Sequence, residues 1–392
     1  MSKLIVVVGS CMVDFISNVE RLPKAGETVL GKEFKRSWGG KGANQCVAAA
    51  KLGASTMLIA SLGSDIFGEE YFQALKSFNI DTKYIKLRKD ISSGVAQIIV
   101  DDNVLVFYFS IYFNIDFIFA KGDNKIVIVP GANTLLSPAD VDEAEDTVRK
   151  AAVLLAQFET SLETTLRALE LHKGHGISIV NGAPAVANPD LNVLKNCDIF
   201  CINETEAEVM SGIEPLTLKN TQEALDKFFK LGCNTVIITL GAEGAVFASR
   251  DNPKMVHVPV EKVKPVDTTG AGDAFLGALA YFIAYHPSLT LKEQIRRACH
   301  VAKESVLKAA TQASFPMKEE NLFFLCQTFF PFLHMFFHFD FPLLCLHFFN
   351  FLLPIYLFFF RSFIFASYKF FIIIIIIVVT TIIIIRTLFG II

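Results

Sequence analysis

Short apolar runs alternate with longer stretches of helical periodicity over most of the chain, and this alternation restricts the fold more than any other feature. The apolar runs predict buried strands at residues 4–9, 153–157, 177–181, 198–202 and 235–239. The amphipathic stretches predict helices at residues 43–52, 67–78, 162–172, 205–211, 221–231 and 271–285. Strand–helix alternation of this kind predicts an α/β fold with a doubly wound, mostly parallel sheet covered on both faces.

Three other segments do not fit that alternation. Residues 28–34, 95–100 and 126–129 have strand character, but no helix follows them at the expected spacing. They predict a small separate sheet. If residues 104–121 are ignored, a polar turn joins the second and third of these strands as an ordinary hairpin.

Phenylalanine is distributed very unevenly. Of 38 Phe residues, 20 lie in 321–392 and five lie in 104–121. We interpret both segments as translated AT-rich non-coding sequence, the first resembling an unspliced intron. A membrane anchor is the alternative, because 370–385 and 341–360 are apolar enough to be candidate spans near the lower length limit. We therefore expect a domain at 1–320 and a tail at 321–392 that is not part of its native fold.

Charge and cysteine content exclude several classes of function. The formal net charge is −3 without any Lys/Arg block, so nucleic acid is not an expected partner. The eight Cys are scattered, and the pair Cys197 and Cys201 has no second pair to complete a zinc site. The first apolar run is too short for a signal peptide and ends at Gly9. Free thiols are typical of reducing compartments, so we expect a location in the cytoplasm, with the nucleus as a second one.

The string from Asp267 to Phe275 carries the strongest chemical signal. Its small residues Gly270, Ala271 and Gly272 open an apolar helix, where converging backbone N–H groups can bind an anion. Asp273 then falls in the first helical turn, where a carboxylate can accept a proton from an alcohol that attacks a phosphoryl group. The alternative for an isolated Gly-x-Gly-Asp is a helix-capping Asp after a glycine turn.

With Gly39-Gly40-Lys41-Gly42-Ala43-Asn44-Gln45 some 230 residues earlier, this string resembles the two signatures of the PfkB-type carbohydrate kinases. The Lys-Gly pair is similar to the version found in the ribose-phosphorylating members. The resemblance implies a ribokinase-like fold with a small β-sheet lid, at roughly 24–38 and 90–130. It also implies ATP-dependent phosphorylation of D-ribose at the 5-hydroxyl, with Asp273 as base and the N–H groups of 270–273 as the anion hole.

Further roles follow from this resemblance alone. The implied sugar-binding residues are Met12, Val13, Asp14, Gly40, Lys41, Gly42, Ala43, Asn44, Glu159 and Asp273. The implied ATP-binding residues are Asn203, Thr239, Leu240, Gly241, Ala242, Glu243, Gly244, Gly272, Asp273 and Cys299. Read without the family, Asp14 and Glu159 are ordinary solvated or capping residues, and Asn203 caps a helix.

The resemblance also implies metal ions and an oligomer. Glu206 is expected to hold Mg²⁺ indirectly, through its water. The implied K⁺ ligands are Asp267, Thr269, Ser305, Lys308, Ala310 and Ser314, mostly through backbone carbonyls, with Ala310 where glycine is usual. A homodimer through the lid is expected. Two alternatives remain open: a related kinase acting on another sugar or a nucleoside, and a non-catalytic, misfolded or membrane-tethered splice product.

Overall fold

The computed structural model describes residues 2–101 and 124–318. The chain divides into two compact units, Met1–Leu325 and Cys326–Ile392. The Phe-rich segments 104–121 and 321–392, with the candidate membrane spans, lie outside the described residues. Within the described residues, no helix is long and apolar enough to cross a membrane.

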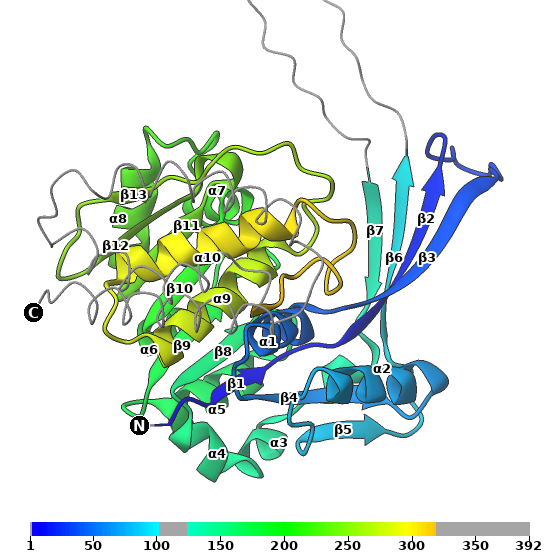
Figure 1. The fold of residues 1–392 in the computed structure, drawn as a ribbon, viewed down its shortest axis with the longest axis horizontal. Helices are drawn as coiled ribbons and strands as arrows, with labels where there is room; N and C mark the ends of the chain where they lie inside the picture. The colour runs from blue at the N-terminus through cyan, green and yellow to red at the C-terminus, as the bar shows by residue number, and fades with distance from the viewer. Residues whose placement is uncertain (1, 102–123, 319–392) are drawn as a thin grey trace, which may run out of the picture. The chain divides into compact units, whose positions relative to one another are not determined.

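A nine-stranded sheet forms the centre of the molecule, with the strand order β13-β12-β11-β10-β9-β8-β1-β4-β5 (Figure 1). Every neighbouring pair from β5 to β11 is parallel, and β12 and β13 add antiparallel pairs at one edge. The strands are β1 Ile5–Val8, β4 Thr56–Gly63, β5 Ile85–Arg88, β8 Val153–Gln157, β9 Ile177–Asn181, β10 Ile199–Asn203, β11 Thr235–Thr239, β12 Ala245–Ser249 and β13 Val256–Val258.

Helices cover both faces of this sheet. One face carries α1 Lys41–Lys51, α2 Ile66–Ser77, α9 Ala271–Tyr285 and α10 Leu291–Ser305. The other face carries α3 Pro138–Asp142, α4 Glu145–Lys150, α5 Leu162–His172, α6 Leu191–Asn196, α7 Glu204–Ser211 and α8 Thr221–Leu231. In β1, Ile5 and Val7 belong to the first core while Val6 and Val8 belong to the second, and all four are fully buried. A strand buried on both faces must therefore be apolar at every position.

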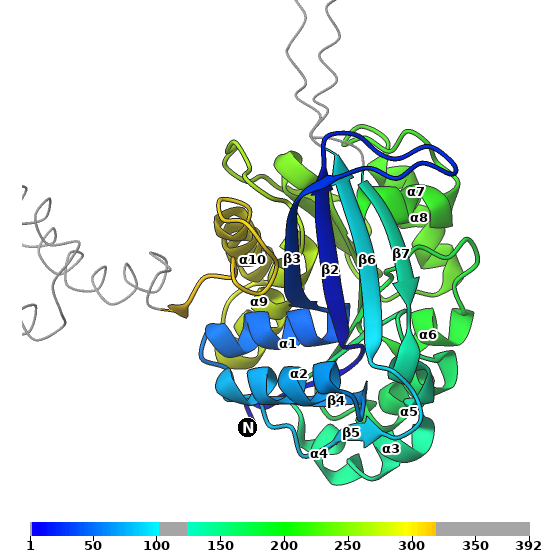
Figure 2. The same cartoon turned by 90° about the vertical axis from the view of Figure 1, so that its right-hand side faces the viewer.

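A second, four-stranded sheet has the order β3-β2-β6-β7 and we call it the small sheet. Figure 2 shows it from one side, with α1 and α2 near its base. Its strands are β2 Met12–Val19, β3 Gly31–Gly39, β6 Gly94–Asp101 and β7 Asn124–Val129. The pair β2–β6 is parallel and the other two pairs are antiparallel. The hairpin predicted for the second and third segments is confirmed by the pairing of Val100 with Asn124.

The sequence was least informative about the small sheet. The strand predicted at 28–34 is β3, which begins at Gly31 and ends at Gly39, and β2 was not predicted at all. The first six residues of β3 are exposed, so no alternation of buried and exposed positions marks where the strand begins. In contrast, β8, β9, β11, α5, α8 and α9 have the predicted bounds.

One buried side chain joins the two sheets. Asn133 lies in the 3₁₀ helix η1 Gly131–Leu135 and is 1% exposed. Its Oδ1 accepts from the Cys11 N–H at 2.8 Å, and its Nδ2 donates to the carbonyls of Cys11 and Pro130, both at 2.8 Å. Cys11 leads into β2 and Pro130 follows β7. The amide therefore fastens two connections between the sheets to one point.

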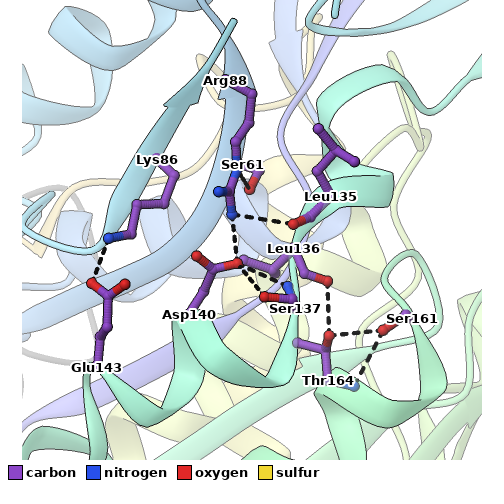
Figure 3. A network of polar contacts seen from close by, with 10 residues as sticks. All are labelled: Ser61, Lys86, Arg88, Leu135, Leu136, Ser137, Asp140, Glu143, Ser161 and Thr164. Atoms are coloured by element: carbon purple, nitrogen blue, oxygen red, sulfur yellow. Dashed lines mark hydrogen bonds and ion pairs between the residues drawn. The ribbon is translucent and has the colours of Figure 1, made fainter.

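A polar network supports η1 and the residues that follow it (Figure 3). Arg88, at the end of β5, donates to the Leu135 carbonyl at 3.1 Å and pairs with the buried carboxylate of Asp140. Thr164 of α5 donates to the Leu136 carbonyl at 2.8 Å. These contacts hold both ends of the η1–α3 connection to the body, so that the position of Asn133 is fixed from outside the site.

Candidate active site

The site is built where the carboxyl ends of the parallel strands meet. Strands β8, β9, β10 and β11 end there at Gln157, Asn181, Asn203 and Thr239, and the registers place these ends side by side. In open α/β sheets this edge is where ligands bind. Polar side chains at strand ends can therefore converge without entering the apolar cores.

Asp273 is a buried acid at this edge. It lies in the first turn of α9, whose N-cap Gly270 has a φ of 77°, and the residue is 8% exposed. Asn44 donates to its Oδ2 at 2.9 Å, and Gln45 donates to its Oδ1 at 3.0 Å. Burial raises the pKa of Asp273, while Lys41 and the two amides oppose that rise. The carboxylate is thus held by donors at a helix N-terminus, where the dipole favours an anion.

The α9 N-terminus also offers backbone donors. The Ala271 N–H bonds to the Thr268 carbonyl at 3.2 Å, and the Ala274 N–H bonds to the Gly270 carbonyl at 2.8 Å. The N–H groups of Gly272 and Asp273 belong to the first turn, which has no carbonyl partner in its own helix. Gly272 is exposed and a Cβ there would meet nothing within 4 Å. An anion can therefore approach these groups.

Two glycines bring α1 against the end of β1. Gly40, the N-cap of α1, has a φ of 87°, a conformation that other residues rarely adopt. A Cβ on Gly42 would lie 2.6 Å from the backbone of Gly9, so the two chain segments touch without side chains between them. This close approach places Lys41 and Asn44 next to the strand edge.

Glu159 and Asp14 approach from the other elements. Glu159 follows β8, accepts from the Lys41 N–H at 2.9 Å and bonds to the Ser10 hydroxyl. Asp14 lies on β2 of the small sheet and is 9% exposed. A Cβ on Gly39 would fall 2.3 Å from its Oδ2, so glycine at this position makes room for the carboxylate.

The site is electrostatically crowded. Burial raises the pKa of Asp14 to about 7, and Glu159 and Asp273 add to the effect. Burial also raises the pKa of Glu159 and of Glu206. Burial alone would lower the pKa of Lys41, but the surrounding carboxylates outweigh it and raise that pKa. These carboxylates are Asp273, Glu159 and Glu206. Three acids around one ammonium, with Asp14 nearby, make a site suited to hydroxyl donors and to a cation.

The residues that the sequence predicts to bind ATP lie next to these acids, at the same edge of the large sheet. Asn203 caps α7 in a capping box with Glu206, at 2.8 Å in both directions. Residues 239–244 form the tip of the β11–β12 hairpin, where the Leu240 N–H bonds to the Gly244 carbonyl at 2.8 Å. Cys299 is 6% exposed in the core of α10, and burial raises its pKa to about 12. Within the described residues, no hydrogen bond joins this hairpin tip or Cys299 to Asp273.

The residues that the sequence predicts to bind K⁺ lie on two segments that hydrogen bonds connect. Both oxygens of Asp267 accept backbone N–H groups, from Thr269 at 2.9 Å and from Ala310 at 3.1 Å. Ala310 has a φ of 72°, which explains why glycine suits this position. Ser314 donates to the Thr311 carbonyl at 2.8 Å. Ser305 and Lys308 are joined by a bond from the Lys308 N–H to the Ser305 carbonyl at 3.2 Å.

Several contact residues were missed from the sequence. They are buried amides and a phenol that surround Asp273 and Asn44: Gln45, Tyr71, Gln157, Asn181 and Gln312. Gln45 closes the first signature string and Gln157 stands two residues before Glu159, so both lay inside recognised motifs. No motif marked Tyr71 or Gln312. Tyr71 lies inside a helix and Gln312 in a loop, and both are distant in sequence from the motif residues that they contact.

Comparisons with known proteins agree with this geometry. The model of the pfkB family of carbohydrate kinases matches residues 2–318. A mouse ribokinase is 41% identical over 317 residues, covering 81% of this chain and 93% of that protein. A Salmonella typhi deoxyribokinase is 38% identical over 317 residues, covering 81% and 96%. The structure of an Arabidopsis thaliana ribokinase complexed with ribose and ATP superposes with a TM-score of 0.72 at 28% identity, covering 83% and 99%.

Proposed function

The chain belongs to the pfkB family of carbohydrate kinases, and on that premise we propose that it transfers the γ-phosphoryl group of ATP to the 5-hydroxyl of D-ribose. The observation that carries this proposal is Asp273, a buried carboxylate held by two amides at the N-terminus of α9. A base in this place accepts the hydroxyl proton, beside backbone N–H groups that favour negative charge on the transferred group.

The remaining residues divide the work of binding. Asp14, Glu159 and Asn44 offer polar partners to sugar hydroxyls, which need them once water is excluded. Lys41 places a positive charge among the acids and balances the charge of an incoming phosphate. The small sheet, which carries Asp14, acts as a lid that excludes water when it closes over the sugar.

Asp273→Asn tests the base. We expect kcat with ribose at saturating ATP to fall about 10²–10⁴-fold, because general-base catalysis contributes that much. Ribose binding, measured by calorimetry, should change little. A variant that keeps near wild-type kcat would contradict the assignment.

Comparing kcat/KM for ribose, 2-deoxyribose, fructose and adenosine identifies the substrate. A clear preference for adenosine would refute ribose as the substrate but would leave the kinase assignment intact.

The residues suit an indirect magnesium site. Within 2–101 and 124–318, no group of three His, Cys, Asp or Glu side chains is placed to hold a metal ion. Glu206 already accepts the Asn203 N–H, so it fits the role of holding a water on Mg²⁺ that arrives with ATP. Bound Mg²⁺ neutralises charge on the phosphoryl oxygens.

We also propose that K⁺ binds between the loops that Asp267 joins, with Thr269, Ser305, Lys308, Ala310 and Ser314 supplying mostly carbonyl oxygens. The support is the pair of bonds from Asp267 to Thr269 and Ala310, which brings the two loops together. Activity should rise with K⁺ and respond far less to Na⁺. Equal rates with K⁺ and with tetramethylammonium would rule this out.

Residues 104–121 and 321–392 are, in this proposal, dispensable for catalysis, since every proposed site residue lies outside them. A chain lacking both should be soluble and more active than the full chain, because exposed aromatic and Ile surface promotes aggregation. If instead the full chain is active in carbonate-washed membranes and the shortened chain is inactive, the tail is an anchor. We propose that the shortened protein lies in the cytoplasm and also enters the nucleus.

A further inference from the structure

Each oxygen of Asp273 faces an amide, and a glutamine lies behind each amide. Behind Asn44 stands Gln312, whose Nε2 donates to the Asn44 Oδ1 at 3.0 Å. Behind Gln45 stands Gln157, whose Nε2 donates to the Gln45 Oε1 at 2.8 Å. Exposure of these four amides is at most 5%. The carboxylate therefore sits at the meeting point of two short hydrogen-bond chains that come from opposite sides.

The direction of both chains follows from the chemistry of the groups. An ionised carboxylate only accepts, so Asn44 and Gln45 must turn their NH₂ groups toward Asp273. Their oxygens then point away, and each needs a donor behind it because an unpaired buried acceptor is costly. A side-chain amide is a donor at one end only, so the glutamine behind must also be turned with its NH₂ group forward.

Groups of fixed orientation next to Gln312 and next to Gln45 hold this direction. Gln312 also donates to the Tyr71 hydroxyl at 2.7 Å, and that hydroxyl donates onward to the Gly39 carbonyl at 2.7 Å. Gln45 also donates to the Asn181 Oδ1 at 3.2 Å, and Asn181 donates to the Cys201 carbonyl at 3.2 Å. Backbone carbonyls cannot reverse, so they anchor the orientation of the amides.

We propose that Gln312 and Gln157 are positioning residues of the phosphoryl-transfer reaction, which fix the orientation of Asn44 and Gln45 and thereby keep both oxygens of Asp273 hydrogen-bonded. This inference rests on the proposed role of Asp273 as the base. Neither glutamine touches the reacting groups; each acts through one intermediate amide. Without the glutamine, the oxygen of that amide is buried without a donor, so the orientation that keeps its NH₂ group on the carboxylate becomes costly and the ionised form is less favoured.

The other charged groups that face Asp273 come from four elements. Lys41 on α1 favours its ionised form, while Asp14 on β2, Glu159 after β8 and Glu206 on α7 oppose it. Substitution of Gln312 or Gln157 leaves all four in place. A change in the pKa of Asp273 in these variants would therefore be caused by the amides and not by the four charged groups.

The test is the pH profile of kcat/KM for ribose in Gln312→Met and Gln157→Met, which keep the side-chain volume but remove the donor. We expect the acid limb to move up by about one pH unit in each, the size typical of losing one hydrogen bond to a charged group. Well above the limb, activity should stay within about threefold of wild type. A loss that is equal at every pH would overturn the proposal.

Gln294→Met is the matched control. Gln294 is also a buried glutamine, 6% exposed, and donates to the His286 carbonyl at 3.2 Å, away from the site. It should lower Tm without moving the acid limb, and an equal shift in this variant would overturn the proposal. If a Met variant does not fold, Gln312→Asn and Gln157→Asn withdraw the donor by one methylene and are measured in the same way.

A double substitution separates the two chains. In an Asn44→Ala background, Gln312→Met should add no further shift of the acid limb, whereas Gln157→Met should still add one. A further shift from Gln312→Met in this background would overturn the proposal, because Gln312 would then act by a route other than Asn44. If Asp273→Asn keeps the activity and the acid limb, the base assignment fails instead, and that result is distinct from any outcome of the glutamine series.

Discussion

The two sheets of this molecule differ in how much of their apolar surface is buried. The nine-stranded sheet is covered by helices on both faces, and β1 divides its four residues between two cores. The small sheet leaves large apolar side chains in water, with Phe34 63% exposed and Val127 64% exposed. Buried area stabilises the first sheet by itself, whereas the second holds its shape through strand pairing and the contacts of Asn133. The comparison teaches that a sheet with exposed apolar faces depends on its attachment to the body.

The largest effect should come from removing a ring in the body rather than in the small sheet. Phe228 is fully buried on α8, so Phe228→Ala should cost about 3–5 kcal/mol of unfolding free energy. Phe34→Ala should cost under about 1 kcal/mol, because the ring is mostly exposed and stacks on Phe15. Urea denaturation of both variants measures the difference. Similar costs would show that the small sheet has a core of its own.

Asp14, at the boundary between the sheets, should make stability depend on pH. Its folded pKa of about 7 lies above the ordinary value of 3.8, so the native state binds the proton more tightly than the unfolded chain. Unfolding free energy should therefore fall as pH rises from about 4 to 7, by at most about 4 kcal/mol.

Asp14→Asn tests this slope in the ligand-free protein. The variant should be more stable than wild type at pH 8 and should show a smaller loss between pH 5 and pH 8. Some slope should remain, since burial also raises the pKa of Asp273 and of Glu159. An unchanged slope in the variant would contradict the assignment to Asp14.

The homodimer expected from the sequence resemblance should form through the face of the small sheet that carries Asp14 and Ile128. Alternation along β7 directs Ile128 to the same face as Asp14 and Val127 to the opposite face, which α2 partly covers through contacts such as Phe67 with Phe15. Ile128→Lys should weaken association at least tenfold, because a charge would be buried without a partner (about 1.4 kcal/mol or more). Val127→Lys is the matched control, and sedimentation equilibrium measures both. Equal effects would refute this choice of face.

The smallest effect should come from Ala310, which marks a local strain in the loop that follows α10. Its φ of 72° is costly for alanine, so Ala310→Gly should stabilise the protein by up to about 1 kcal/mol. The change should raise Tm slightly in thermal melting. A lower Tm would mean that the greater freedom of glycine in the unfolded chain outweighs the strain.

The accuracy of the predictions from the sequence also differs between the large sheet and the small sheet. Strands such as β8 and β9 were predicted to the residue because burial on both faces leaves an uninterrupted apolar run. Strand β2 was missed because half-buried residues such as Ile16 and Ser17 carry no clear period. The motifs placed Asp273 and Asn44 correctly at one edge, yet Gln312 came from a loop 268 residues beyond Asn44. Local patterns cannot show such long-range pairing.

The clamp at Asn133 has a mechanical consequence for the small sheet. Cys11 leads into β2 and Pro130 follows β7, and both bond to the same Asn133 amide. Arg88 and Thr164 hold the connection that carries this amide. The chain segments that enter and leave the small sheet are therefore tied together, so β2 and β7 cannot shift independently of each other. Asp14 on β2 thus keeps its position relative to the rest of the small sheet.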